Sequence, residues 1–187
     1  DGYNQVMTTK SEFLKILEQM YERGYVLVKM HDLAYETVDE NGNTKFVAGN
    51  IMLPPDKKAF VMSQDDVNYY DYMDGEGFAT RIVIGEDGKP TCEYIQKDGT
   101  VVTGEYDLVP VLDRFVEEHP DFSYRGAKAI LAITGYEGTL GYETAWYRYN
   151  EAEHLVGLTE DEKTAMFEAE KASCKEVVAA LKADGYE

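Results

Sequence analysis

Apolar residues near the start of the chain recur at the three- and four-residue spacing of one helical face. This pattern predicts a helix over residues 11–23. Either Thr9 or Ser11 can cap its start, and Thr9 with Glu12 has the spacing of a capping box. The apolar run over residues 25–29 then predicts a buried strand, so the chain opens with a helix and a strand.

Turns and a second strand follow. Residues 31–37 indicate a short helical turn, and the sequence DENGN at 39–43 is typical of a tight turn. The apolar run at 58–62 predicts a strand. We expect this strand to lead directly into a loop that carries Asp65 and Asp66.

The pattern changes to alternating residues over 77–106. Three strand-like runs cover residues 78–84, 91–95 and 100–106, and an Asp-Gly pair separates each run from the next. Asp-Gly between alternating runs is a strong hairpin signal. We therefore expect a three-stranded antiparallel meander, inserted into a chain that otherwise alternates between helices and strands.

Helices and strands alternate again after the meander. Asp107 suits the N-cap of a helix that ends before His119, because a residue preceding proline disfavours helix. A third buried strand is expected over 127–134, an irregular segment over 135–154, and a final helix over 159–183. This alternation predicts an α/β fold, with parallel strands covered by helices.

We expect residues 1–187 to belong to a single domain, of which this chain contains only a part. The last helix leads into Gly185 and Tyr186, which repeat the form of Gly24 and Tyr25. The earlier pair opens a predicted strand, so a further strand is expected after the later pair as well.

The composition is that of a globular protein with a strongly acidic surface. Hydrophobic residues make up 44% of the chain, which is typical of globular proteins, and no apolar run is long enough to span a membrane. The formal net charge is −18, which repels nucleic acid and anionic lipid, and we expect neither as a partner. Cys92 and Cys174 form either one bridge or two free thiols.

Asp65 and Asp66 are the leading candidates for chemistry. They follow a strand of the expected parallel sheet, and active sites of α/β proteins collect at the carboxyl ends of such strands. Two adjacent carboxylates that point in different directions can divide two tasks, one holding a metal ion and the other accepting a proton. The alternative is structural, because aspartates in loops also form turns and cap helices.

A longer pattern surrounds the two aspartates, from about Thr9 to Gly135. It comprises a helix, a Gly-Tyr step, a strand, a Leu-Pro stretch, SQDD at 63–66 and VPVL at 109–112. This order resembles the polysaccharide deacetylase (NodB-homology) family, in particular a divergent clostridial-type branch. The first motif of that family is Thr-Phe-Asp-Asp-Gly, followed by a Pro-x-Leu helix. The resemblance implies part of a distorted (β/α) barrel, with residues 77–106 as an inserted β-meander.

The resemblance also implies an activity. Members remove acetyl groups from N-acetylated or O-acetylated sugars of polysaccharides, which implies a place outside the cell or on the surface of a bacterium. By position, Asp65 matches the general base and Asp66 matches the aspartate that binds zinc or a similar divalent ion. Such an ion polarises the carbonyl and lowers the pKa of a bound water, while a carboxylate removes the proton.

The sequence departs from the family pattern around the metal. Val67 replaces a glycine, Gln64 replaces an aromatic residue, and the family's pair of histidines one helical turn apart is absent. His31 follows a strand, so it is the candidate for a further metal ligand, whereas His154 lies among acidic residues and is expected to be solvated. Because a catalytic zinc usually has three protein ligands, we expect this chain alone to bind metal weakly and to show little or no deacetylase activity.

The chain contains 15 tyrosines. Tyr69 and Tyr70, next to the aspartates, are candidates for sugar binding, because their rings offer an apolar face and a polar tip. The alternative is that these rings pack the interior. A second function therefore remains open, in which the chain is a non-catalytic module that binds carbohydrate or a partner and the aspartates are a relic.

Overall fold

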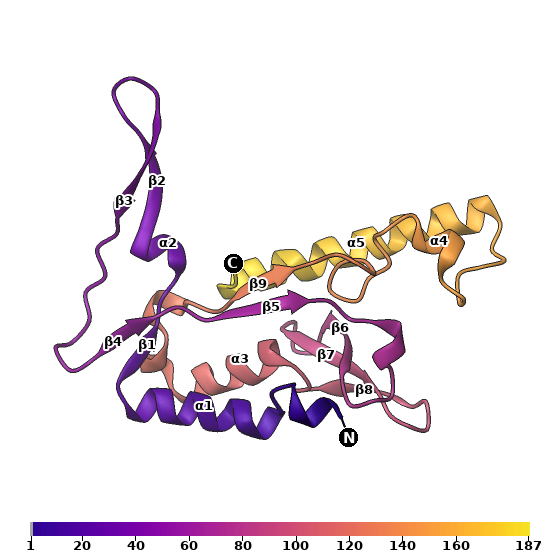
Figure 1. The fold of residues 1–187 in the computed structure, drawn as a ribbon, viewed down its shortest axis with the longest axis horizontal. Helices are drawn as coiled ribbons and strands as arrows, with labels where there is room; N and C mark the ends of the chain where they lie inside the picture. The colour runs from indigo at the N-terminus through magenta and orange to yellow at the C-terminus, as the bar shows by residue number, and fades with distance from the viewer. Residues whose placement is uncertain (1) are drawn as a thin grey trace.

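Parallel strands form the centre of the molecule. The computed structural model describes residues 2–187. Strand β1 (Tyr25–Leu27) pairs in parallel with β4 (Lys58–Phe60), and β5 (Ser63–Val67) pairs in parallel with β9 (Ile130–Ile133). Strand β4 runs on into β5 after a break at residues 61–62, so β1 and β9 lie beside the two halves of one long segment (Figure 1).

A Gly-Tyr step leads from each of two helices into a strand position. Helix α1 (Lys10–Glu22) is followed by Gly24 with φ 77°, and α5 (Glu160–Asp184) ends at Gly185 with φ 107°. A Cβ atom on Gly185 would lie 2.1 Å from the carbonyl oxygen of Gly126. Because of both the left-handed backbone and this close approach, only glycine fits where α5 turns back toward β9.

The last three residues pair with the segment that leads into β9. The amide of Lys128 donates to the carbonyl of Gly185 over 3.2 Å. The amide of Glu187 donates to Ala129 over 3.1 Å, and its carbonyl accepts from Leu131 over 2.8 Å. Since the bonds alternate between partners as in a parallel ladder, residues 185–187 take the place of a parallel strand next to β9.

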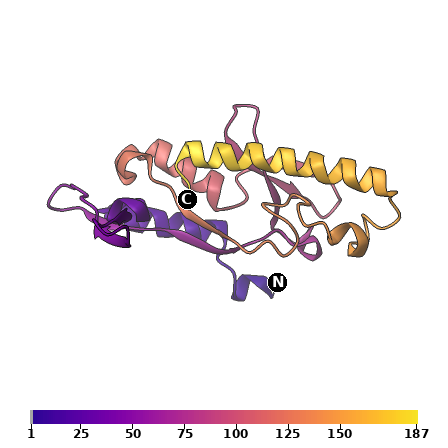
Figure 2. The ribbon, with the colours of Figure 1, turned by 90° about the horizontal axis from the view of Figure 1, so that it is seen from above.

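The helix starts follow the predicted capping signals. Thr9 caps α1 and Thr159 caps α5, in each case with a glutamate three residues later that completes the capping box. Asp107 caps α3 (Leu108–Glu118) by accepting a hydrogen bond from the amide of Leu108. Helix α5 runs along the long axis of the molecule (Figures 1 and 2). These three predicted helices are confirmed, and they begin where the sequence indicated because local side-chain bonds fix their starts.

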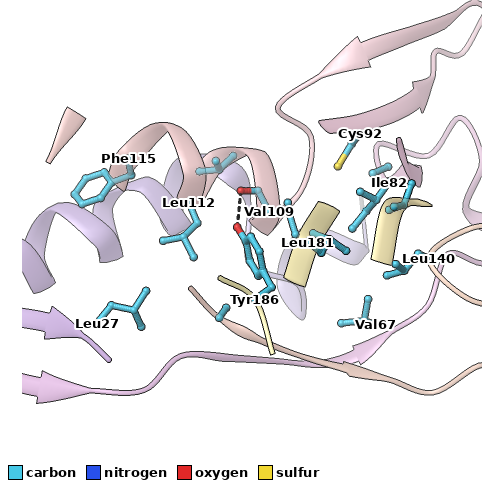
Figure 3. Close-up of a cluster of buried hydrophobic side chains, with 14 of the residues drawn as sticks. Leu27, Val67, Ile82, Cys92, Val109, Leu112, Phe115, Leu140, Leu181 and Tyr186 are labelled. Atoms are coloured by element: carbon cyan, nitrogen blue, oxygen red, sulfur yellow. Dashed lines mark hydrogen bonds between the residues drawn. The ribbon is translucent and has the colours of Figure 1, made fainter. Parts of the chain in front are cut away.

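The main core lies between helices and strands. Figure 3 shows Val109 and Leu112 of α3 facing Leu27 and Val67 of the strand layer, and all four side chains are at most 2% exposed. Tyr186 lies among them, and its hydroxyl donates to the carbonyl of Val109 over 2.9 Å. The C-terminal segment is therefore part of this core.

A buried ion cluster ties the same segment to α3. The Lys128 ammonium lies 2.5 Å from Asp113 Oδ1 and 2.7 Å from Asp184 Oδ2. The hydroxyl of Tyr186 lies 2.7 Å from Asp113 Oδ1. Burial raises the pKa of Asp113 to about 6, although its bonds to Lys128 and Tyr186 act in the opposite direction.

The expected meander is present. Strands β6 (Ala79–Ile84), β7 (Pro90–Ile95) and β8 (Val101–Gly104) form a three-stranded antiparallel sheet. Cys92 and Cys174 are buried free thiols, so they do not pair. The general α/β class is confirmed, but the strands of residues 2–187 form small sheets and no closed barrel.

A projecting hairpin replaces part of the expected helical turn. Helix α2 covers Met30–Leu33 only, and β2 (Ala34–Val38) pairs with β3 (Thr44–Ala48) in an antiparallel hairpin that extends away from the rest (Figure 1). The prediction of helix beyond Leu33 is therefore wrong. The side chain of Asp39 closes the turn by accepting from the amide of Asn43 over 2.8 Å, which fixes the hairpin that the sequence signal left open.

The prediction of a loop directly after residues 58–62 is also wrong. Residues 63–67 form β5, because their backbone pairs with β9. Residues 135–154 are largely irregular as expected, apart from the short helix α4 (Arg148–Glu151). The remaining short elements are 3-10 helices at Tyr3–Gln5, Asp71–Met73, Pro120–Phe122 and Tyr124–Gly126.

A second hydrophobic cluster lies under the irregular segment. Its buried members are Tyr149, Ala152 and Leu155, with Phe167 of α5 packed against them. Phe167 therefore belongs to this cluster, whereas Cys174, Val177 and Leu181 on the same helix belong to the main core. No helix in the described chain has the length and apolar character needed to cross a membrane.

Candidate active site at the paired aspartates

A β-bulge presents both aspartates to solvent. Gln64 of β5 lies opposite Leu131, and Val67 lies opposite Ile133, so β5 has one residue more than β9 over this interval. Side chains of a regular strand alternate between faces, and a bulge interrupts the alternation. Val67 is consequently 2% exposed in the core, while the two aspartates before it are both exposed.

Asp66 has the unusual backbone that this bulge requires. Its φ is 50°, in the left-handed region that aspartate tolerates better than most residues. The amide of Asp66 donates to Asp65 Oδ1 over 2.9 Å. Within residues 2–187 no lysine, arginine or histidine forms an ion pair with either carboxylate, so both charges face water.

The other side of β5 is bonded to the start of α3. The Asp107 carboxylate accepts from Gln64 Nε2 over 3.3 Å, from the Tyr69 hydroxyl over 2.8 Å and from the Leu108 amide. Burial, followed by the charge of Asp107, raises the pKa of Tyr69 well above its ordinary value. The Tyr69 hydroxyl proton is therefore directed at the helix cap, and Gln64 helps to hold the strand in place.

Tyr70 lies on the side of the aspartates. Its ring centroid is 5.3 Å from that of Tyr72, with the two rings tilted by 33°. Burial raises the pKa of Tyr70, and the negative charge of Asp66 adds to this effect. Of the two candidate sugar-binding tyrosines, Tyr70 is thus close enough to Asp66 to feel its charge, while the Tyr69 hydroxyl bonds to the cap of α3.

His31 bonds to the C-terminal residue. Its Nδ1 lies 2.5 Å from Glu187 Oε1, and the amide of Met30 donates to Glu187 Oε2 over 3.1 Å. Helix α2 lies beside the start of the long β4–β5 segment, whereas the aspartates lie toward its end (Figure 1). The structure does not bring His31 together with Asp65 or Asp66.

The donors at the paired aspartates therefore do not fit a catalytic zinc. Such an ion usually takes three protein ligands plus water. In the part of the chain that the structure describes, no set of three His, Cys, Asp or Glu donors within 4.8 Å of one another includes Asp65, Asp66 or His31. We accordingly assign no step of the chemistry to a metal ion.

A buried ion network, which no sequence signal predicted, lies next to this site. Arg148 of α4 is 8% exposed and pairs with Asp71, with Glu137 over 3.4 Å and with Glu143 over 3.3 Å. Burial lowers the pKa of Arg148, but its bonds to Glu143 and Asp71 outweigh burial and hold the pKa above its ordinary value. Arg148 thus joins the segment after β5 to the segment after β9.

His154 borders this network. Its Nε2 lies 3.1 Å from Glu143 Oε1, and its Nδ1 lies 3.6 Å from Asp71 Oδ2. These three side chains have donor atoms within 4.8 Å of one another, the spacing of a metal site. The same two carboxylates already bind the Arg148 guanidinium, so the arrangement is accounted for as an ion-pair network. The imidazole is half exposed, but it contacts two carboxylates that the sequence did not predict as its partners.

Comparisons with known proteins do not identify the chain. No protein-family profile matches it, no curated protein matches it, and no solved structure matches its fold.

Proposed function

We propose that this chain carries the active-site aspartates of a polysaccharide deacetylase-like hydrolase, which removes acetyl groups from N-acetylated or O-acetylated sugars. The observation that carries the proposal is the bulge in β5, which turns two adjacent, unpaired carboxylates toward solvent at the carboxyl end of a parallel strand. This is the edge where α/β proteins place their reacting groups. A bulge that leaves one strand residue in a left-handed conformation is a typical feature of functional sites.

The two carboxylates have different roles in this proposal. Asp65 is the general base, which removes a proton from the attacking water, and the hydroxide adds to the acetyl carbonyl. Collapse of the tetrahedral intermediate breaks the bond to the sugar nitrogen or oxygen. The proton held by Asp65 passes to the sugar amine or alcohol, and the acetic acid formed leaves and loses its proton to water to give acetate. By the resemblance, Asp66 is the metal-binding aspartate, and within residues 2–187 the further donors that such an ion requires do not lie near it.

The arrangement of strands supports the proposal that the chain forms part of a (β/α) barrel. Strand β5 leads through the meander and α3 to its parallel neighbour β9, and α5 then leads to residues 185–187 on the other edge of β9. Successive parallel strands connected by helices are the building units of (β/α) barrels. We therefore propose that these residues form part of a distorted barrel, in a protein that acts outside a bacterial cell or on its surface.

The absence of further metal donors near Asp66 in residues 2–187 favours one alternative function. A carbohydrate-binding module with Asp65 and Asp66 as a relic would need no metal ligands, and Tyr70 with Tyr72 would suffice to hold a sugar ring. The two functions differ in their products, since only the hydrolase releases acetate.

The decisive experiment is to read the gene beyond the codon for Glu187 and to assay the protein it encodes. We expect a strand followed by two histidines one helical turn apart. We also expect EDTA-sensitive acetate release from an N-acetylated oligosaccharide, lost in both Asp65→Asn and Asp66→Asn. A stop codon directly after Glu187, or a longer protein that binds the sugar but releases no acetate, would overturn the hydrolase and leave the binding module.

A further inference from the structure

Four tyrosines form an exposed surface beside Asp66. Tyr72 and Tyr136 are both 63% exposed, Tyr147 is 48% exposed, and Tyr70 is half-buried against Tyr72. Large exposed rings in one place are unusual on a monomer and mark a binding surface. We refer to Tyr70, Tyr72, Tyr136 and Tyr147 as the tyrosine surface.

Two loops that touch each other build the tyrosine surface. The amide of Asp71 donates to Glu137 Oε2 over 2.9 Å, and the amide of Glu137 donates to Asn68 Oδ1 over 3.4 Å. The hydroxyl of Tyr147 donates to the carbonyl of Tyr136. These bonds join the loop after β5, which carries Tyr70 and Tyr72, to the segment after β9, which carries Tyr136 and Tyr147.

The charges around the tyrosine surface are negative. Asp66 contributes a free carboxylate, and Asp74 and Glu76 are exposed close to Tyr72 in the sequence. The nearby cation Arg148 is buried and already paired with three carboxylates. Arg81, whose charge also reaches Asp74, is paired with Glu93 and Glu170.

The imidazole of His154 lies between two further carboxylates, 3.6 Å from Asp71 and 3.1 Å from Glu143. Arg148, Arg81 and His154 are thus all paired with carboxylates, and the negative charges around the tyrosine surface would repel a uronate chain. A positively charged ligand would be attracted both by the carboxylates and by the faces of the tyrosine rings, since each ring face is electron-rich.

We propose that the tyrosine surface binds an amine-bearing sugar chain, namely an amino-sugar polymer from which part of the acetyl groups has already been removed. Each ring stacks on the apolar face of a sugar, and the protonated amines of neighbouring sugars face Asp66 and the exposed carboxylates. This inference rests on the proposed function, because it places a partly deacetylated chain next to the aspartates that act on its remaining acetyl groups. It makes partly deacetylated polymer the preferred substrate.

Binding of matched oligosaccharides to the full 187-residue chain tests the proposal. The probes are tetramers of N-acetylglucosamine, of glucosamine and of a uronic acid, measured by calorimetry at low and high salt. We expect the glucosamine tetramer to bind about tenfold tighter than the N-acetylated one at low salt. The difference should shrink at high salt, and the uronate should not bind. Tetralysine, which has amines but no sugar faces, should bind at least about tenfold more weakly than the glucosamine tetramer.

Variants separate the tyrosine surface from general attraction to an acidic protein. Tyr72→Ala and Tyr136→Ala should each weaken binding of the glucosamine tetramer about threefold to tenfold, the range expected for one aromatic contact. Tyr35→Ala, on the distant hairpin and 48% exposed, should leave it unchanged. Equal binding of tetralysine, equal affinity for the N-acetylated tetramer, or full binding by both tyrosine variants would overturn the proposal.

Acetate release by the longer protein is read separately. If acetate is released but the tyrosine variants bind normally, the proposed function stands and the inference fails. If the tetramers bind as expected and no acetate is released, the hydrolase fails, and with it the inference that the amine-bearing chain is a substrate.

Discussion

Arg148→Met is the substitution from which we expect the largest effect on the site. It keeps much of the apolar stem of the side chain and removes the charge that Asp71, Glu137 and Glu143 share. The side chain of Glu143 is 10% exposed, so its carboxylate would be left buried without its arginine partner. Removing one partner of a buried ion pair costs about 3–5 kcal/mol.

The exposure of Asp71 places the expected loss of stability at the lower end of that range. The Asp71 side chain is 47% exposed, so water already screens much of its interaction with Arg148. We therefore expect a loss of about 3 kcal/mol in the free energy of unfolding. For a chain of this size, this corresponds to a fall in Tm of about 6–12 °C. Thermal unfolding followed by circular dichroism measures the fall in Tm directly.

A matched arginine and a rescue variant make this test specific. Arg114 pairs with Glu105 over 2.8 Å, but its side chain is 43% exposed. Arg114→Met makes the same change in net charge and should cost less than about 1 kcal/mol. Adding Glu143→Gln to Arg148→Met should restore at least about 1 kcal/mol, because the unpaired buried charge is removed. If the two arginine variants unfold within about 1 kcal/mol of each other, the reasoning about burial is refuted.

Three further predictions concern stability. The raised pKa of Asp113, about 6, means that the folded state holds this proton more tightly than the unfolded state. The stabilisation from this group is therefore full below about pH 4 and is lost as pH rises toward 6. In urea titrations, the difference in unfolding free energy between the parent and Asp113→Asn should change over this pH interval, and a constant difference would contradict the prediction. Asp66→Gly should raise the free energy of unfolding by about 0.5–1 kcal/mol, because φ at this residue is positive. Asp65→Gly on the same strand should lower it, and equal effects of the two variants in chemical unfolding would argue against strain at Asp66. The net charge of −18 should make Tm rise between low and moderate salt, as screening reduces self-repulsion; calorimetry that finds no rise would rule this out.

Local signals determined much of the secondary structure. Capping boxes at Thr9 and Thr159 and the N-cap at Asp107 fixed three helices from the sequence, because each signal is a bond between residues at most three apart. The Asp-Gly pairs fixed the meander in the same way. The hairpin at β2 and β3 was missed, since its strands expose polar and apolar residues alike and lack a clear alternation.

The sequence by itself singled out Asp65 and Asp66, but it could not determine which way they face. Only pairing with β9, a strand more than sixty residues away, introduces the bulge that turns both carboxylates outward and buries Val67. The Arg148 network was likewise decided by tertiary structure, because its carboxylates come from separate loops. Short-range bonds leave their mark in adjacent residues, whereas the register of a parallel sheet and the partners of a buried charge depend on segments that meet only in the folded chain.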